Sequence, residues 1–354
     1  MVATFLKDSA LIKDESEASR IHNKGCFGEP QSGGSLKLNL LEALYLFESE
    51  RLNIAGPGGR AMGFGELVTY ASRRIRNFEV RYIVYSDMRR SGVIVNLSED
   101  EENGIDFTLY RRGDTPKNAS PEAYVIVASE RQLFDIDFLI SAAKGSEGTG
   151  KEIVMSVVDE EGDITYYRIR TQKPRAHAAE KLSRQFSGIL LSDRVIIPDG
   201  EGADTLRAEG FYGNRLGSGL QLSLIEAVHL MAAKCLRLTS ARTGRHVPLN
   251  SLVDLSQRLD PAFGQKVSVY EDLKGRGFIV KTGFKYGSHF RAYDDDPEKA
   301  HAKYLVIAVP PGYVSTWPDI SGTVRLAHGV RKEILFARTG GSAVDYLELR
   351  RFVL

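Results

Sequence analysis

Apolar and polar positions in the second half of the chain follow helical spacing in some segments and strand spacing in others. Between Ser223 and Leu236, for example, Leu224, Val228 and Met231 recur at the interval that places them on one face of a helix. The pattern predicts helices over Ser223–Leu236, 249–259, 264–274 and Asp319–Arg331, and strands over Phe278–Thr282, His289–Tyr293 and Tyr304–Val309. Helices flanking a small mixed sheet are an economical arrangement of such elements, so an α/β or α+β fold is expected.

The same pattern occurs in the first half of the chain. Tyr85–Gly92 recurs as Tyr270–Gly277, 185 positions later, and Glu42 recurs as Glu226, 184 positions later. Tyr124–Val127 likewise matches Tyr304–Ile307. A nearly constant offset over the whole length indicates a tandem duplication. We expect each repeat to hold a small α+β N-terminal subdomain followed by an α/β subdomain with a mixed sheet flanked by helices. The expected subdomains are residues 1–80, 81–175, 186–263 and 264–354.

Composition is that of an ordinary globular chain. Its 354 residues are 42% apolar and carry a net charge of +1, so any site for a polyanion must come from local clustering of basic residues. The two cysteines, Cys26 and Cys235, cannot form a disulfide framework or a four-thiolate metal site. The N-terminus lacks a signal-peptide pattern, and the longest apolar runs have the length of strands. A cytoplasmic protein without a membrane span is therefore expected.

A glycine-rich segment, Gly145–Lys151, fits the first seven positions of a phosphate-binding P-loop. However, Glu152 follows where that motif needs Ser or Thr to hold magnesium, and the preceding Leu139–Ala143 has a helical pattern. No nucleotide cofactor is therefore expected.

A run of acids, Asp159, Glu160, Glu161 and Asp163, lies between two predicted strands of the first repeat. One interpretation is a solvated hairpin turn. The other is a peg that docks into a basic pocket of a second subunit. The second repeat begins with Arg338 at the corresponding place and lacks the acids, so any docking role belongs to the first repeat alone.

The region from Lys274 to Lys332 combines basic and aromatic side chains. The basic residues are Lys274, Arg276, Lys281, Lys285, Arg291, Arg325, Arg331 and Lys332, and the aromatic residues among them are Phe284, Tyr286, Phe290 and Tyr293. Basic groups bind phosphates and aromatic rings stack on unpaired bases, which is what contact with RNA requires. A charged strand face is the alternative interpretation.

Three residues of this region, Tyr293, His301 and Lys332, are of types that can share a proton-transfer reaction. The sequence match between the repeats gives Tyr110 and Lys151 as counterparts of the tyrosine and the lysine, but Pro121 as the counterpart of the histidine. At most one repeat can therefore carry out acid–base chemistry with this set. Lone surface histidines such as His289 and His328 are usually without a role.

These residues resemble the archaeal tRNA-splicing endonucleases, in the two-repeat form that works as a homodimer. The resemblance is carried by Tyr270–Tyr293, His301–Val306 and Arg325–Lys332, within the last quarter of the chain. It implies an endonuclease that cuts precursor tRNA at a bulge-helix-bulge, at both intron boundaries, and leaves a 2′,3′-cyclic phosphate and a 5′-hydroxyl.

The resemblance also implies roles for the trio. Tyr293 would act as the base that takes the proton of the RNA 2′-hydroxyl, although a phenol needs a nearby cation such as Lys332 to ionise. His301 would be the acid that protonates the leaving 5′-oxygen. Lys332 would stabilise the charge on the phosphate. No metal and no other cofactor is expected.

Two further implications concern partners. Arg325 resembles an arginine that stacks on a bulge base, a second such arginine is expected near Arg350, and Lys285 is a further candidate for RNA contact. The acids from Asp159 to Asp163 would dock against the catalytic unit of the second subunit of a homodimer.

Two rival interpretations remain at this point. One is a non-catalytic RNA-binding or structural subunit of an RNA-processing complex, against which the intact trio argues. The other is a metal-dependent DNA nuclease of similar α/β shape, which would need paired acids and a lysine on one strand. No such set is evident in the sequence.

Overall fold

A computed structural model describes residues 1–98, 103–177, 182, 184–341 and 343–354. These residues divide into two compact units. Unit 1 contains residues 1–133, 142–169 and 351–354, and unit 2 contains residues 134–141 and 170–350. Among the described residues, no helix is long and apolar enough to cross a membrane.

Each repeat begins with a small sheet and three helices. In unit 1 the elements are β1 (Val2–Phe5), β2 (Ser9–Ile12), α1 (Glu15–Gly25), β3 (Glu29–Pro30), β4 (Leu36–Asn39), α2 (Leu40–Glu48), β5 (Asn53–Ala55) and α3 (Phe64–Ser72), with the sheet order β3-β4-β2-β1-β5. In unit 2 they are β12 (Phe186–Leu190), β13 (Val195–Ile197), α6 (Gly200–Gly210), β14 (Asn214–Leu216), β15 (Gly219–Leu222), α7 (Leu224–Ala232), β16 (Leu236–Ser240), β17 (His246–Val247) and α8 (Leu249–Leu259), with the order β14-β15-β13-β12-β16-β17.

A buried glutamate links the sheet to the second helix in both copies. Glu42 caps α2 together with Asn39, and its other oxygen accepts the amide of Gly28 at 2.8 Å. Glu226 does the same for α7 and Gly213. Because a buried carboxylate needs such donors, the pair of glutamates recognised in the sequence match proves to be a shared structural device.

The rear part of unit 1 is a mixed sheet. Its elements are α4 (Phe78–Arg90), β6 (Val95–Leu97), β7 (Phe107–Leu109), β8 (Ala123–Ser129), β9 (Leu133–Asp135), α5 (Ile136–Glu147), β10 (Glu152–Val158) and β11 (Ile164–Gln172). The sheet order is β6-β7-β8-β10-β11, in which only β8 and β10 are parallel. The first residues of α5 and the end of β11 belong to unit 2.

The rear part of unit 2 repeats this sheet. Its elements are α9 (Phe263–Gly275), β18 (Ile279–Thr282), a 3-10 turn η4 (Phe284–Tyr286), β19 (Phe290–Tyr293), β20 (Tyr304–Val309), β21 (Val314–Thr316), α10 (Trp317–Gly329), β22 (Glu333–Arg338) and β23 (Asp345–Phe352). The order is β18-β19-β20-β22-β23, and only β20 and β22 are parallel.

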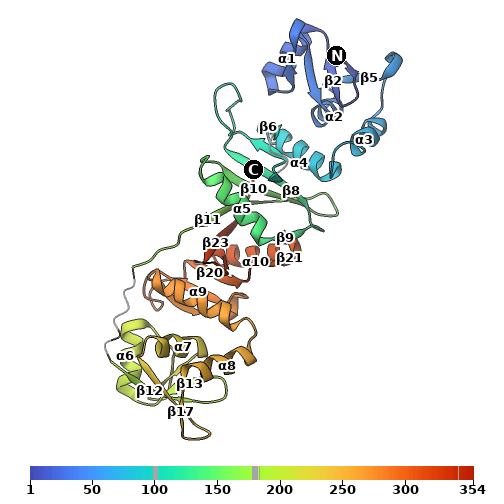
Figure 1. Cartoon of the computed structure of the whole chain (residues 1–354). Helices are drawn as coiled ribbons and strands as arrows, with labels where there is room; N and C mark the ends of the chain where they lie inside the picture. The colour runs from blue at the N-terminus through green and yellow to red at the C-terminus, as the bar shows by residue number, and fades with distance from the viewer. Residues whose placement is uncertain (99–102, 178–181, 183, 342) are drawn as a thin grey trace. The chain divides into compact units, whose positions relative to one another are not determined.

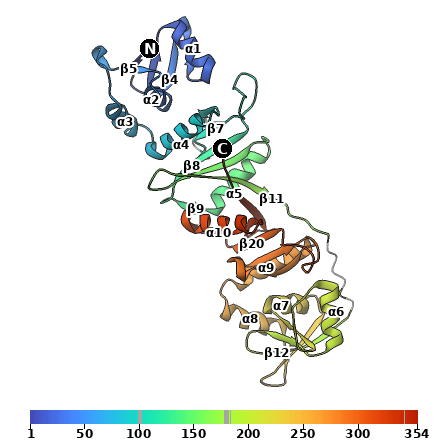
Figure 2. The same cartoon turned by 180° about the vertical axis from the view of Figure 1, so that it is seen from behind.

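The two long helices of this part cover opposite faces of its sheet. Tyr270 of α9 belongs to the same core cluster as Ala292 and Leu335. The alternate strand residue Phe336 instead meets Phe134, whose ring also contacts Trp317 of α10. In both views β20 lies between α9 and α10 (Figures 1 and 2).

The predicted fold class is confirmed: the chain is a duplicated α+β protein with mixed sheets and helices. One predicted boundary is wrong, because α7 ends at Ala232 rather than Leu236. The chain leaves the helix at Lys234, which has a φ of 60°, and Leu236 begins β16. The four subdomain ranges stay a proposal.

Candidate active site

The register of the second mixed sheet brings Tyr293 and Lys332 to the same end of the sheet. Ala292 of β19 lies opposite Tyr304 of β20, and Tyr304 lies opposite Glu333 of β22. Tyr293 is the residue after Ala292, and Lys332 is the residue before Glu333. The two strands flank β20, and both side chains therefore lie at the same end of the sheet.

Strand alternation also places both side chains on the same face. Ala292 and Leu335 point to the core under α9. Successive strand residues point to opposite faces. Tyr293 is one residue after Ala292, and Lys332 is three residues before Leu335. Both side chains therefore lie on the opposite face of the sheet, which α10 covers.

Two further residues connect Tyr293 with Lys332. The guanidinium carbon of Arg291 lies 5.6 Å from the ring centre of Tyr293 and 5.8 Å from that of Tyr286. The Nζ of Lys332 lies 5.4 Å from the same Tyr286 ring. Arg291 is itself fixed, because its Nε donates to the carbonyl of Thr282 at 2.8 Å. The resulting group of two tyrosines and two cations is an electropositive site suited to a phosphate.

His301 lies in the loop between β19 and β20, and its side chain is exposed. The next residue, Ala302, is buried in a small cluster with Ile279 and Tyr293. In the described part of the chain, His301 makes no hydrogen bond or ion pair with Tyr293 or Lys332. The structure thus places two members of the predicted trio at the same end of the sheet and the third on an adjoining loop.

The predicted RNA-binding residues occupy two faces. Lys285 is exposed in η4, and Arg325 is exposed in α10. The two elements meet, since a Cβ on Gly287 would lie 3.9 Å from Leu326. Arg350 is exposed on β23, two residues after Glu348. Glu348 pairs with Leu335 of β22, so both side chains lie on the face of the sheet that α9 covers. Arg350 therefore lies on the face opposite Lys332.

The acidic run forms the hairpin between β10 and β11, as predicted. Oδ1 of Asp159 accepts the amides of Glu161 at 3.0 Å and Asp163 at 2.9 Å, which fixes the turn. Glu160 pairs with Arg131 at 2.5 Å. All four acids are exposed, so the hairpin presents negative charge to solvent.

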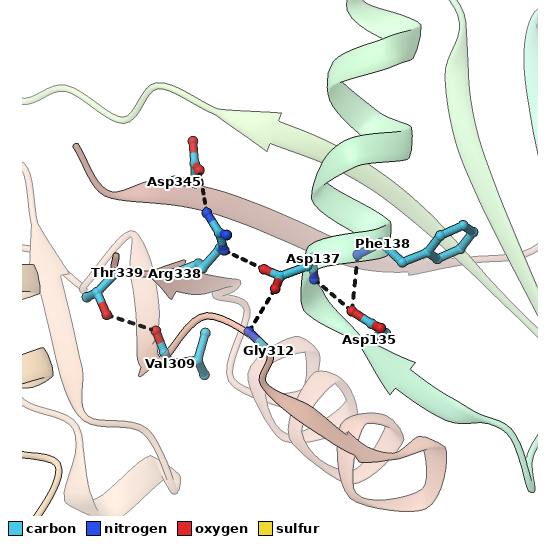
Figure 3. Close-up of polar contacts among 8 residues, drawn as sticks. All are labelled: Asp135, Asp137, Phe138, Val309, Gly312, Arg338, Thr339 and Asp345. Carbon is cyan, nitrogen blue, oxygen red and sulfur yellow. Dashed lines mark hydrogen bonds and ion pairs between the residues drawn. The ribbon is translucent and has the colours of Figure 1, made fainter. Parts of the chain in front are cut away.

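The corresponding hairpin of the second repeat is engaged within unit 2 (Figure 3). Arg338 donates through Nε to Asp137 at 2.5 Å and pairs with Asp345 at 3.3 Å. The other oxygen of Asp137 accepts the amide of Gly312 at 2.7 Å. The two hairpins thus differ: one offers acids to solvent, and the other offers an arginine that is already bound.

The first repeat keeps a similar set of side chains with a different lysine partner. Nζ of Lys151 donates to the hydroxyl of Tyr124 at 2.9 Å. Tyr110 is buried. Burial is the largest cause that raises the pKa of its phenol, although the hydroxyl of Thr108 and the charge of Lys151 oppose the rise.

Strand register corrects the sequence match between the repeats by one residue. The amide of Glu122 bonds to Leu109 O, and the amide of Lys303 bonds to Ala292 O. Glu122 is therefore the counterpart of Lys303. Ser120 lies two residues before Glu122, and His301 lies two residues before Lys303, so Ser120 is the counterpart of His301. The prediction that Pro121 stands there was wrong. Neither residue is a histidine, so the loss itself is unchanged.

The same correction changes the partner of the lysine. Tyr124 is the counterpart of Leu305, not of Tyr304 as the letters suggested. Leu305 has no group that could accept a hydrogen bond from Lys332, whose Nζ instead donates to the carbonyl of Val330 at 3.2 Å.

In the sequence, Arg291 and Tyr286 stand out only as parts of a basic and aromatic stretch. A signal for Arg291 was available, since Thr108 stands at its place in the first repeat. His289 is also engaged: its Nδ1 accepts the amide of Ala308 at 3.0 Å, and burial lowers the pKa of the imidazole to about 4. Within the described ranges, no three His, Cys, Asp or Glu side chains gather as metal ligands.

Comparison with known proteins identifies the class to which this fold and site belong. The family model of the tRNA intron endonuclease N-terminal domain matches residues 1–68 and 186–253. The model of the catalytic C-terminal domain of the same family matches residues 78–166 and 263–346. The chain therefore belongs to the tRNA intron endonuclease family, and the predicted resemblance to the archaeal enzymes is confirmed.

Several archaeal relatives share the whole length of the chain. A tRNA-splicing endonuclease of Methanosarcina mazei is 35% identical over 356 residues, which cover 99% of both chains. Those of Methanococcoides burtonii and Haloferax volcanii are 34% and 31% identical, and the alignments cover 99% and 98% of both chains. The duplicated arrangement is thus matched from end to end.

Proposed function

We propose that this protein is a tRNA-splicing endonuclease that cleaves precursor tRNA at a bulge-helix-bulge, with Tyr293, His301 and Lys332 as its catalytic residues. The observation that carries the proposal is the cationic group at the end of the second sheet, where Arg291 lies beside the rings of Tyr293 and Tyr286, and Lys332 lies beside the same Tyr286 ring. This group lies inside the second match to the family's catalytic domain.

The chemistry follows from these residue types. Tyr293 removes the proton of the 2′-hydroxyl, which attacks the adjacent phosphate and closes a 2′,3′-cyclic phosphate. The bond to the 5′-oxygen breaks, and His301 supplies the proton that this oxygen needs. Lys332 balances the extra negative charge of the pentacoordinate phosphate, and Arg291 adds a second cation beside Tyr293. Exposure of His301 is consistent with contact to a large substrate.

The products and the cofactor requirement can be tested together. An intron-containing precursor tRNA is incubated with the full chain in EDTA, and the ends of the fragments are analysed. Cleavage at both intron boundaries, with cyclic-phosphate and 5′-hydroxyl ends, is the expected result. Binding without cleavage would favour a non-catalytic subunit, and cleavage only after Mg²⁺ is added would refute the metal-independent mechanism.

A homodimer in which the acidic hairpin of one chain docks on the catalytic unit of the other is also part of the proposal. Its support is the contrast between the exposed acids at 159–163 and the engaged hairpin of Arg338. Glu161 and Asp163 carry the charges best placed for docking, because Asp159 holds the turn and Glu160 already pairs with Arg131.

The docking hypothesis predicts that Glu161→Lys/Asp163→Lys yields monomers without cleavage activity. A matched control, Glu29→Lys/Glu50→Lys, makes the same charge change on exposed acids of the first N-terminal subdomain. Sedimentation and cleavage are measured for both. An active dimer of Glu161→Lys/Asp163→Lys would refute the docking role, as would equal dissociation of the control.

A further inference from the structure

The first helix of each N-terminal subdomain ends on a residue in the left-handed backbone region. Cys26 follows α1 with a φ of 50°, and Phe211 follows α6 with a φ of 55°. Glycine is the usual residue at such a helix end, because a side chain is disfavoured in this conformation. In both copies, however, a residue with a side chain takes this position.

In each repeat this side chain lies near the tyrosine at the end of the mixed sheet. Phe211 packs against the buried cluster that contains Tyr293 and Ala302. In the first repeat, Cys26 lies close enough to Tyr110 for the two groups to interact electrostatically. The contact in the second repeat is the larger of the two, because the aromatic ring of Phe211 stands where the first repeat has the thiol of Cys26.

A second contact reaches the loop that carries His301. Arg207 lies in the last turn of α6, and its Nη2 pairs with Oε1 of Glu298 at 2.5 Å. The amide of Glu298 in turn donates to Asp296 at 2.9 Å, so the ion pair is joined to the turn of this loop.

The first repeat has no equivalent ion pair among its described residues. His22 stands at the place of Arg207, and its Nδ1 lies 3.1 Å from the carbonyl of Phe27 within its own subdomain. The connection between helix end and loop is therefore a property of the second repeat.

We propose that the second N-terminal subdomain is a positioning element of the active site, in which Phe211 supports Tyr293 and Arg207 holds the His301 loop through Glu298. This inference rests on the function proposed above. Neither Phe211 nor Arg207 touches the reacting atoms in this role. Their effect is on geometry, to which catalysis is sensitive: a displacement of about 1 Å can lower a rate by ~10²-fold.

A charge exchange tests the ion pair. In single-turnover cleavage by the full chain, Arg207→Glu and Glu298→Arg are each expected to lower kcat roughly five- to ten-fold, with KM within about two-fold. The double variant Arg207→Glu/Glu298→Arg restores the attraction and is expected to return to within about two-fold of the wild type. Single variants without effect, or a double variant as slow as the singles, would overturn the role of Arg207.

A matched pair of glycine variants tests the other contact. Phe211→Gly removes the ring and relieves the left-handed backbone, so the helix end is retained. We expect kcat to fall on the order of ten-fold, with an unchanged thermal midpoint of unfolding. Cys26→Gly makes the same change in the first repeat and is expected to leave kcat unchanged. Equal rates for the two variants would refute the role of Phe211.

These outcomes are separable from failure of the proposed function. A wild-type protein that does not cleave precursor tRNA, or a Tyr293→Phe variant that cleaves at the wild-type rate, would refute the proposed function itself. A wild-type protein that cleaves, together with inert variants at Arg207 and Phe211, would refute only the positioning role.

Discussion

The two mixed sheets hold a tyrosine and a lysine at the same register but direct the lysine differently. In the first repeat, Lys151 bonds to the hydroxyl of Tyr124 on the neighbouring strand. In the second, Leu305 takes the place of Tyr124, and Lys332 lies beside the ring of Tyr286. That ring also neighbours Arg291, whose counterpart is Thr108. The same two residue types therefore lie in different environments in the two repeats.

The comparison shows that the first repeat differs from the second at three linked positions. The first repeat has Ser120 in place of His301, Thr108 in place of Arg291 and Tyr124 in place of Leu305. The first change removes a proton donor, the second removes a cation beside the tyrosine, and the third binds the lysine to a neighbour. Restoring one position should not restore the chemistry.

The largest expected effect comes from the histidine. His301→Ala should lower kcat for precursor tRNA by about 10²–10⁴-fold, since a group that transfers a proton in the transition state contributes that much. Single-turnover cleavage measures the change. Adding Ser120→His to His301→Ala supplies an imidazole in the first repeat. No recovery is expected there, and cleavage by this double variant would break the comparison.

The lysines provide the next contrast. Lys332→Ala should lower kcat by roughly 10²–10³-fold, the usual loss when one group that stabilises transition-state charge is removed. Lys151→Ala should leave kcat within about two-fold of the wild type while removing the bond to Tyr124, which contributes about 1 kcal/mol to stability. Comparable kinetic losses in both variants would contradict the assignment of catalysis to the second repeat.

Much of this comparison could be predicted from sequence. Apolar spacing revealed the elements, a constant offset revealed the duplication, and residue types singled out Tyr293, His301 and Lys332. These signals are local or periodic. The match of Tyr124 with Tyr304 was wrong because it rested on identical residue types. The hydrogen-bonded strand register decides which residues of the two repeats correspond.

Contacts between distant segments could not be predicted in this way. Arg207 and Glu298 are far apart in the chain, and only the fold brings them within 2.5 Å. The early end of α7 had a similar cause. Apolar residues continue past Ala232, but Leu236 is taken up by β16, so tertiary pairing overrides the helical pattern.

Arg291 should have a smaller effect than Lys332. Arg291→Ala removes a cation from beside Tyr293 and is expected to lower kcat about ten-fold, in the range of a partly exposed charged contact. Thr108→Ala is the matched change in the first repeat and should be silent in the same cleavage assay. An Arg291→Ala enzyme as fast as the Thr108→Ala enzyme would remove Arg291 from the site.

The smallest expected effect concerns the residue directly before β7 and β19, which in both repeats accepts a hydrogen bond from a backbone amide. Asp106 accepts the amide of Val127 at 2.7 Å and pairs with Arg81, whereas His289 accepts the amide of Ala308 and neighbours Lys266. Burial, with a smaller contribution from Lys266, lowers the pKa of His289 to about 4. The neutral ring is therefore favoured in the folded state.

The sign of the pH dependence follows from this depressed pKa. An unfolded histidine titrates near pH 6.5, so the stabilisation is complete above that value and is lost as pH falls from about 6.5 towards 4. After allowance for solvent screening of the half-buried ring, the loss is on the order of 1–2 kcal/mol. His289→Gln keeps a carbonyl acceptor and cannot be protonated. Urea unfolding at pH 7 and pH 5 should therefore show a larger loss of stability for the wild type than for His289→Gln, and equal losses would exclude titration of His289 as the cause.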